Sequence, residues 1–480
     1  MRAGGSARWL AGYGALLVVA VTWPFLVPGG AFALRDMMVF DAMALTRASL
    51  GWGDLPARNV PQDALLGILP HPVLFLRFAV VGAAACAARA GYLLGRGTFG
   101  RAAAMTVAVW NPFVVERLLQ GQWSLAVAAW MLPLVALGRG PAATLAHWLA
   151  SLTPTGALAA ACAARGRVGL AVSALTCLPW VVAGVFAGAG GTASAASAGV
   201  FAPRAEALAG TLGALAGLGG IWNGEAVPPS RSAGFALAGV ALLALLALAW
   251  RDVPRRWLAL AAAGFALALT SWAGLTGPLV AHVPGAGLLR DGQKWLILAV
   301  PAYVAAAGAL NGRRALAACA FALLQVPDAP VALAALTPVP AAAVEIPAVD
   351  DRGRDVVFES RPALTRVGGR VAVDPAPKAM NVVESGALAV DGVVVDPPSA
   401  RWSAAQVALD GPDSLGRLRE LGIGLAVRAD GSVVDAGAPA RGLPPVGVAL
   451  FALWCAVPLL ACVQGHTLKI NRPHLHRYSD

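Results

Sequence analysis

Apolar blocks of membrane-crossing length recur along this chain and constrain its fold more than any other feature. A helix needs roughly 20 apolar residues to cross a hydrocarbon layer about 30 Å thick. Blocks near that length stand at residues 9–28, 232–250, 257–272 and 295–310. Hydrophobic residues make up 58% of the 480 residues and charged residues only 13%, which is too few charges for the surface of a soluble protein. The sequence therefore predicts an α-helical polytopic membrane protein.

The positions of the charges predict its orientation. The net charge is +11, and arginines gather in short loops between apolar blocks, such as Arg96 with Arg101 and Arg313 with Arg314. An excess of arginine in short loops is typical of the cytoplasmic side of a membrane protein. The basic composition therefore indicates topology and contact with membrane lipid, and no nucleic-acid partner. We expect about 11–13 spans in the plasma membrane, with both termini cytoplasmic.

Changes in composition divide the chain into four parts. We expect a transmembrane bundle at residues 1–337 with a long first outer loop at 29–72, an extracytoplasmic domain at 338–445, a final span at 446–463 and a cytoplasmic basic tail at 464–480. A helix-like stretch is expected in the first outer loop at residues 40–49. The sequence Thr153-Pro154-Thr155-Gly156 predicts a helix break near membrane depth.

The expected outer domain differs from the rest because acidic residues appear and short valine-rich runs alternate with turns. Such runs are typical of short strands. The pattern predicts a small α/β domain, with strands at 371–373, 389–390, 393–395 and 424–427 and a helix at 414–421. The six cysteines have no CxxC spacing, so neither a zinc site nor a disulfide framework is indicated. Walker A, HExxH and GxSxG motifs are also missing from the sequence.

Polar residues that topology does not explain form three groups on the expected outer side. The first group lies in the outer loop and includes Asp36, Asp41 and Asp63. A carboxylate just after the first span is suited to act as a general base, because partial desolvation at the membrane surface tunes its pKa. The alternative interpretation is that these charges only solvate a loop.

The second group follows the third apolar block and contains Glu116, Arg117 and Gln122. Charged groups this close to hydrocarbon are costly unless they are paired or face a cavity. Two interpretations stay open: a polar cavity, or a mutual Glu116–Arg117 ion pair with Trp123 as an anchor at the membrane interface.

The third group, Arg290, Asp291, Gln293 and Lys294, directly precedes an apolar block. Its cations lie on the expected outer side, against the charge trend. Arginine and lysine supply hydrogen-bond donors and charge for a phosphate group, although contact with lipid headgroups is the competing interpretation. His282 lies in the same loop and is a weaker site candidate, with a packed loop histidine as the alternative.

Several segments together resemble an uncharacterised family of actinobacterial multi-span membrane proteins. They are residues 34–40, 57–64, 110–117 with Gly121-Gln122-Trp123, and 289–295, and in the expected outer domain residues 374–377, 388–392 and 418–427. The architecture also resembles the GT-C superfamily of membrane glycosyltransferases, which have many spans, a long first outer loop with an acidic residue and an outer soluble domain.

The resemblance implies a polyprenyl-phosphate sugar as donor and roles for particular residues. Asp36 would accept a proton from the acceptor hydroxyl, and Asp41 would assist it or bind a metal. Arg290, Lys294 and Arg117 would hold the donor phosphate. Asp36 and Asp41 stand five residues apart and Arg35 precedes the first, which departs from the paired-acid motif of several GT-C branches. The need for a divalent metal is therefore left open, and no other cofactor is expected.

The leading functional hypothesis is sugar transfer from a lipid-phosphate donor to a cell-envelope glycan or lipid acceptor on the outer face. One alternative is a transporter or flippase of lipid-linked envelope precursors, which would use the helix break and intramembrane charges as a pathway. Another is a non-catalytic assembly protein whose outer domain recruits partners. The assembly protein would tolerate Asp36→Asn, whereas the transferase would not. The transferase predicts a lateral, lipid-facing groove that ends at Asp36, and the transporter predicts a cavity that reaches the membrane midplane.

Overall fold

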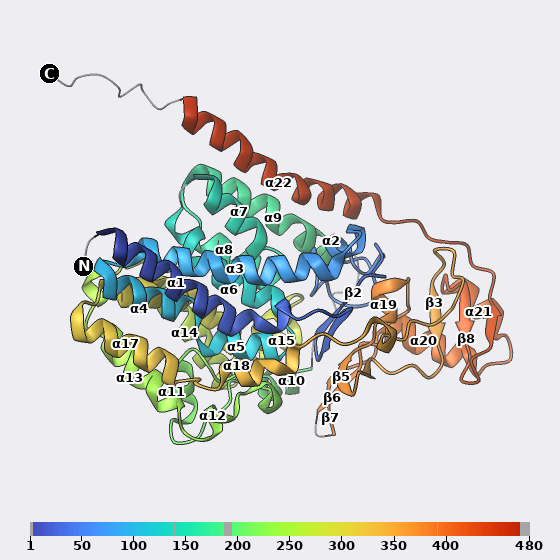
Figure 1. Cartoon of the computed structure of the whole chain (residues 1–480). Coiled ribbons are helices and arrows are strands. Elements are labelled where there is room, and N and C mark those ends of the chain that lie inside the picture. Colours follow the sequence, from blue (N-terminus) through green and yellow to red (C-terminus); the bar gives the residue numbers. More distant parts are fainter. Residues whose placement is uncertain (1–2, 139, 187–193, 391, 471–480) are drawn as a thin grey trace.

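The computed structural model describes residues 3–138, 140–186, 194–390 and 392–470. Asp391 of the expected outer domain and residues 471–480 of the expected basic tail lie outside the described residues. Most of the described chain is helical, and its strands are short. Figure 1 shows the long helices gathered in one bundle, with a smaller group of strands and helices at the end opposite the N-terminus.

Six helical segments of the described chain are long and apolar enough to cross a membrane. They are Gly5–Leu26, Pro72–Leu94, Gly97–Leu119, Gly166–Phe186, Gly312–Leu336 and Pro445–Gln464. Shorter apolar helices are Trp123–Leu137, Pro154–Ala163 and Ala236–Ala247. The structure thus agrees with an α-helical membrane protein, but it has fewer full-length spans than the expected 11–13. One reason is that apolar blocks are divided into short helices, as in η5 (Gln293–Ala299) and α16 (Val300–Ala309).

The core of the bundle lies between α1 and the helices that follow the first loop. Buried small residues, mostly alanine, allow these helices to approach closely, as membrane helices commonly do. The elements are α1 (Ala3–Thr22), α3 (Pro72–Leu94), α4 (Gly97–Val109), α5 (Pro112–Leu119), α6 (Trp123–Leu137), α13 (Ala236–Ala247), α14 (Arg255–Trp272), α16 and α17 (Gly312–Leu324).

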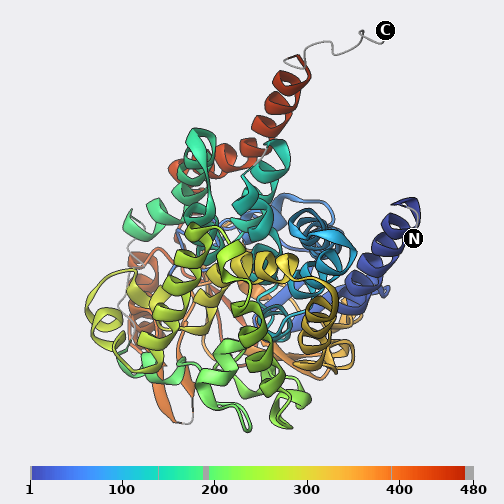
Figure 2. The ribbon, with the colours of Figure 1, turned by 90° about the vertical axis from the view of Figure 1, so that its left-hand side faces the viewer.

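A second group of helices packs beside this core. It comprises α7 (Gly140–Ala150), α8 (Pro154–Ala163), α9 (Gly166–Phe186) and the C-terminal α22 (Pro445–Ile470). The view along the bundle shows α22 beside α7–α9 and apart from α1 (Figure 2). A helix break is present between α7 and α8 at residues 151–153, whereas residues 154–156 of the break expected at 153–156 belong to α8. There Ser151 Oγ accepts a hydrogen bond of 2.8 Å from Trp454 Nε1, so α22 satisfies a polar group at the break.

The first loop forms a buried antiparallel hairpin where a helix-like stretch was expected. Strands β1 (Ala31–Leu34) and β2 (Met37–Phe40) are buried along their whole length, and Arg35 and Asp36 form the turn between them. The helix prediction for residues 40–49 is wrong, since these residues contain no helix. Thr46 and Ser49 instead exchange side-chain to backbone hydrogen bonds of 3.0 and 3.1 Å, which compete with helix formation.

Residues 338–445 divide between the core of the bundle and two small cores of their own. Strands β3 (Val356–Phe358), β8 (Leu425–Val427) and β9 (Val433–Asp435) form one sheet, in which β3 is parallel and β9 antiparallel to β8. This sheet packs with α20 (Ala400–Leu409) and α21 (Ser414–Glu420) around a small core of its own. The strands expected at 393–395 and 424–427 and the helix at 414–421 are present within a residue of their expected bounds.

The remaining strands connect this region to the bundle. Hairpin β4 (Leu364–Val367)–β5 (Arg370–Val373) lies beside the β1–β2 turn, where Arg35 N donates to Val371 O at 2.7 Å and Val373 N donates to Arg35 O at 2.8 Å. Val367 and Ala372 of this hairpin belong to the core of the bundle. A separate two-stranded hairpin, β6 (Leu388–Val390)–β7 (Val393–Asp396), follows it.

The turn of the β1–β2 hairpin lies directly against Gly121. A methyl group on Gly121 would overlap the backbone of Leu34 and Met37, and its φ of +85° is a left-handed conformation that favours glycine. Gly274 has a similar φ of +73° but open space around it. These two glycines therefore separate the effect of backbone conformation from that of the close approach.

We expect Gly121→Ala to lower the apparent melting temperature more than Gly274→Ala. Both substitutions cost about 1–2 kcal/mol of backbone strain. Only Gly121→Ala adds an overlap that costs about 1–3 kcal/mol. Tryptophan fluorescence during heating of the purified protein in detergent measures the difference. Equal shifts in the two variants would contradict the placement of the hairpin turn against Gly121.

Candidate functional site

Asp36 lies at the turn of the β1–β2 hairpin, and the end of α5 fixes that turn. Helix α5 begins at Pro112 behind Asn111, whose Oδ1 accepts a hydrogen bond of 3.1 Å from Val114 N. At the other end of α5, Asp36 N donates to Gln120 O at 3.1 Å. The side chain of Arg35 donates to Leu119 O at 2.5 Å, so backbone and side-chain contacts both hold the turn.

The carboxyl group of Asp36 is accessible to solvent although protein surrounds it. Its Oδ2 accepts a hydrogen bond of 3.0 Å from Gln122 Nε2. Desolvation by these surroundings raises the pKa of Asp36, and the hydrogen bonds and the nearby cations Arg58 and Arg117 only partly oppose this effect. A carboxyl group with a raised pKa that solvent can reach is suited to accept and release a proton.

Arg117 is fully buried and binds three side chains. Its two terminal nitrogens donate to the two carboxylate oxygens of Asp291 at 2.6 and 2.9 Å, a bidentate ion pair. The same nitrogens donate to Gln122 Oε1 at 2.7 Å and to Gln293 Oε1. Burial alone would raise the pKa of Asp291, but the ion pair with Arg117 outweighs burial and lowers it. Gln122 therefore links a buried ion pair to Asp36.

Arg290 and Arg58 share one carboxylate from the hairpin β6–β7. Asp396 Oδ1 lies 2.6 Å from Arg290 Nη1, and its Oδ2 lies 3.2 Å from Arg58 Nη2. The guanidinium group of Arg290 also lies over the ring of Phe201, with 4.2 Å between its Cζ and the ring centroid. Arg290 is buried, whereas Arg58 is exposed.

Lys294 is a buried cation whose ammonium group has no hydrogen-bond partner in the described part of the chain. Its Nζ lies 5.7 Å from the ring centroid of Trp295. Burial lowers the pKa of Lys294 to about 8, and the nearby Arg117 and Arg290 add to the effect against the attraction of Asp291. An anion bound beside Lys294 would supply the missing partner.

The three groups expected from the sequence thus meet in one place, which we call the charge cluster. Members of each group lie within it, together with a residue from the hairpin β6–β7. Its members are Asp36, Arg58, Arg117, Gln122, Arg290, Asp291, Gln293, Lys294 and Asp396. Four cations face three carboxylates, so the cluster keeps one positive charge even when all groups are ionised.

Two of the expected site residues in the first loop lie elsewhere. Asp41 follows the far end of β2, and its Oδ1 accepts a hydrogen bond of 3.3 Å from Val73 N in the first turn of α3. A carboxylate at that position stabilises the start of a helix. Asp63 accepts a hydrogen bond of 2.7 Å from Lys378 Nζ and so connects the first loop with the 338–445 region.

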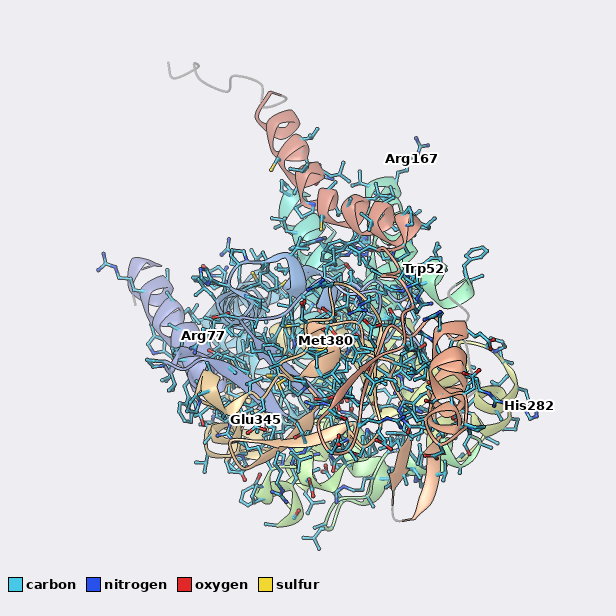
Figure 3. All side chains as sticks on the ribbon, turned by 90° about the vertical axis from the view of Figure 1, so that its right-hand side faces the viewer. Trp52, Arg77, Arg167, His282, Glu345 and Met380 are labelled. Carbon is cyan, nitrogen blue, oxygen red and sulfur yellow. The ribbon has the colours of Figure 1, made fainter. Side chains whose placement is uncertain are left out.

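Glu116 and His282 also make contacts outside the charge cluster. Glu116 is buried on the other face of α5, where its Oε2 accepts a hydrogen bond of 2.9 Å from Ile221 N, and Arg231 lies 4.0 Å away. Of the two interpretations left open for this group, the mutual Glu116–Arg117 ion pair is not formed. His282 Nδ1 lies 2.9 Å from Pro278 O, and Figure 3 shows this side chain at the edge of the molecule.

The surroundings of Asp36 fit an anion better than a metal ion. No group of three or more His, Cys, Asp or Glu side chains suited to a metal occurs among the described residues. The charged groups nearest to Asp36 outside its own turn include Arg58 and Arg117, which would repel a divalent cation. Arginine, lysine and amide donors are instead the groups that bind phosphate oxygens.

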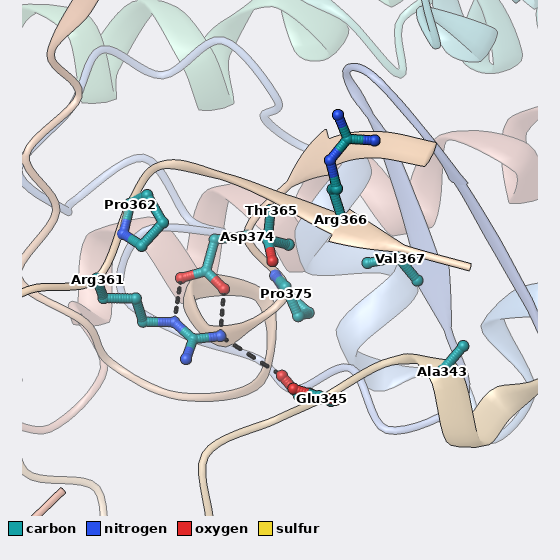
Figure 4. Close-up of a pocket in the computed structure, with 9 residues that line it drawn as sticks. All are labelled: Ala343, Glu345, Arg361, Pro362, Thr365, Arg366, Val367, Asp374 and Pro375. Atoms are coloured by element: carbon teal, nitrogen blue, oxygen red, sulfur yellow. Dashed lines mark hydrogen bonds and ion pairs between the residues drawn. The ribbon is translucent and has the colours of Figure 1, made fainter. Parts of the chain in front are cut away.

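A separate pocket of about 90 Å³ lies beside hairpin β4–β5 (Figure 4). Its Arg361 makes two hydrogen bonds of 2.6 Å with the carboxylate of Asp374 and a third, of 3.4 Å, with Glu345 O. Asp374 already neutralises Arg361, and the second arginine of the pocket, Arg366, is exposed and donates to Gly369 O at 3.3 Å. Neither is a buried cation without a hydrogen-bond partner.

Sequence reasoning did not assign Arg58 or Asp396 to the site. Arg58 was only one of several charges in the first outer loop, and Asp396 ends a valine-rich run without any motif of its own. Asp396 meets Arg290 across 106 residues of sequence and Arg58 across 338. No local signal predicts contacts at those separations, so only the structure identifies both residues.

Comparison with known proteins found no relative of this chain. No protein-family model, curated protein or solved structure matches the chain. Functional inference therefore depends on the contacts and charges within the chain itself.

We expect Lys294→Met to raise the apparent melting temperature near neutral pH, and the gain to shrink as the pH rises. Between pH of about 8 and 10.5 the unfolded state binds more protons at Lys294 than the folded state, so the wild type gains stability with pH there. Melting at about pH 7 and about pH 9.5 tests this expectation. Lys378→Met is the control, because it leaves Asp63 unpaired and lowers the melting temperature at both pH values. A destabilised Lys294→Met at about pH 7 would contradict the assignment of an unpartnered buried cation.

Proposed function

We propose that this protein is a membrane glycosyltransferase that transfers a sugar from a polyprenyl-phosphate donor to a cell-envelope glycan or lipid acceptor on the outer face. One observation carries the proposal: an accessible carboxyl group with a raised pKa lies in the same cluster as a buried lysine without a hydrogen-bond partner. Sugar transfer from a phosphate needs both a base and an anion site, and these must lie close together.

The proposed reaction divides the work between the two sides of the cluster. Asp36, as the carboxylate, accepts the proton of the acceptor hydroxyl. At the same time the oxygen of that hydroxyl forms a bond to the anomeric carbon of the donor sugar. The bond from that carbon to the phosphate oxygen breaks, and the phosphate leaves with the electron pair. Lys294 and Arg290 stabilise the negative charge that develops on the leaving phosphate.

Arg117 receives a different role from the phosphate binding implied by the resemblance. Its two terminal nitrogens bind Asp291, Gln122 and Gln293 and leave little capacity for a ligand. We assign Arg117 as a positioning residue that orients Gln122, which in turn donates to Asp36. Asp41 receives no role in the reaction, because it lies at the start of α3.

The proposed orientation follows from the distribution of arginine. The strands and the 338–445 region lie at the end of the bundle opposite the N-terminus, and α22 returns from there toward the other end (Figure 1). If the arginine-rich loops face the cytoplasm, the hairpin carrying Asp36 faces outward. A helical bundle with a hairpin that carries an acidic residue and a smaller region at the same end supports the proposed likeness to GT-C enzymes.

We expect Asp36→Asn to lower the rate of sugar transfer by about 100-fold or more, because it removes the proton acceptor. Asp41→Asn is the matched control: the amide oxygen can still accept from Val73 N, so activity should stay near wild type. Transfer from polyprenyl-phosphate sugars in isolated membranes, with expression confirmed, measures the rates. Complementation of a deletion strain, read out as envelope glycan composition, tests the same pair in cells.

Lys294→Met should instead weaken donor binding and raise KM for the donor, because it removes the partner of the phosphate. In the wild type, transfer should fall as the pH drops through the raised pKa of Asp36. A normal envelope with Asp36→Asn at wild-type expression would exclude the transferase and favour an assembly role. Loss of precursor export with intact transfer would favour the flippase.

A further inference from the structure

The carboxylate of Asp396 occupies the position that an external anion would take between two arginines. Each of its oxygens faces a different guanidinium group, at 2.6 Å from Arg290 and 3.2 Å from Arg58. Two oxygens of one phosphate group can bind a pair of arginines in the same manner. Burial lowers the pKa of Arg290, and the neighbouring Arg58 lowers it further. An anion between the two arginines therefore stabilises the charge of both.

The hairpin that carries Asp396 contacts the rest of the chain through β7, which packs against α10 (Ala196–Val200) and whose Val395 is buried. In the part of the chain that the structure describes, β6 and β7 pair only with each other. Their ladder is irregular between Leu388 and Ala389, directly opposite Asp396, and such irregularities redirect side chains next to binding sites. The base of the hairpin is closed by Ser399, whose N donates to Ser385 O at 2.7 Å and whose Oγ donates to Glu384 O at 2.6 Å.

The three ion pairs of the charge cluster differ in how exchangeable they are. Arg117 and Asp291 are both buried and bidentate, so separating them would leave an uncompensated buried charge. Arg58, by contrast, has a side chain that is 55% exposed. Water can solvate Arg58 when it separates from Asp396. Arg290 is buried beside Asp396, so that ion pair opens only when another anion takes the place of the carboxylate.

We propose that Asp396 is an internal competitor for the phosphate site, and that hairpin β6–β7 moves away when a phosphate group binds Arg58, Arg290 and Lys294. This inference rests on the proposed function for the identity of the natural ligand as a lipid-linked phosphate. Departure of Asp396 leaves the cluster with one more uncompensated positive charge, which a phosphate can match with more oxygens than a carboxylate. After transfer, the return of Asp396 expels the phosphate product.

The test compares phosphate binding by purified full-length protein in detergent. We expect Asp396→Asn to bind inorganic phosphate about tenfold more tightly than wild type, because the internal competitor loses its charge. Asp435→Asn is the control, since it removes another carboxylate of the same region that pairs with an arginine, Arg354, at 2.9 Å. Its phosphate affinity should equal that of the wild type. Equal or weaker binding by a folded Asp396→Asn overturns the proposal.

A second measurement needs no substitution. Amide hydrogen exchange across β6 and β7 in the wild type should accelerate at saturating inorganic phosphate or with polyprenyl phosphate, whereas unchanged or slower exchange with both overturns the proposal. Nanodiscs with and without polyprenyl phosphate distinguish a free phosphate from a lipid-linked phosphate as the ligand. Acceleration by inorganic phosphate as well shows that the phosphate group suffices, and acceleration in the lipid arm alone identifies a lipid-linked phosphate. Both results support the competition.

Failure of this inference and failure of the proposed function give different results. Phosphate affinity and hydrogen exchange need no sugar transfer. If Asp36→Asn retains transfer while Asp396→Asn still binds phosphate more tightly, the transferase proposal fails and the competition stands. If Asp36→Asn abolishes transfer while Asp396→Asn leaves affinity unchanged, only the competition fails.

Discussion

The buried ion pair between Arg117 and Asp291 is the interaction on which the rest of the charge cluster depends. A charged group taken out of water costs several kcal/mol unless a partner compensates it, and the two oxygens of Asp291 meet both terminal nitrogens of Arg117. The pair connects α5 with the segment before η5, 174 residues away in sequence. It also fixes Gln122, and through it the environment of Asp36. One buried cation thus places the proposed base and the proposed phosphate site relative to each other.

Backbone contacts supply the other half of this arrangement. The β1–β2 turn lies against Gly121, where any side chain would overlap the strand backbone. Hairpin β4–β5 extends the same turn from the opposite side through hydrogen bonds to Arg35. Part of the 338–445 region is therefore built into the bundle, while β3, β8 and β9 keep a core of their own. Asp36 is held from both sides, which suits a group that must meet its substrate in one geometry.

Local patterns in the sequence predict individual helices and strands of this protein, but they do not predict which distant residues come into contact. The apolar blocks predict the helical membrane class, and valine-rich runs predict the short strands near the C-terminus, because both signals depend on neighbouring residues. Asp36, Arg117 and Arg290 were each singled out by charge next to an apolar block. Their side-chain contacts to other elements join residues 86 to 176 positions apart, beyond the reach of periodicity. The helix prediction at 40–49 failed because the Thr46–Ser49 hydrogen bonds outweighed the apolar pattern.

The exposure of each cation in the charge cluster determines whether its ion pair is fixed or can exchange. The side chain of Arg117 is 0% exposed and that of Arg58 is 55% exposed, so the same kind of ion pair has two consequences. A buried pair cannot open without leaving a charge unsolvated, and it therefore holds geometry. The pair of Arg58 with Asp396 has an exposed cation, which water can solvate when the pair opens and which is then available to another anion. Lys294 lies between these limits, buried and without a hydrogen-bond partner among the described residues, so a bound anion gains most there. This difference in exposure suits the buried Arg117 to positioning its neighbours, and it suits Lys294 and Arg58 to binding an anion.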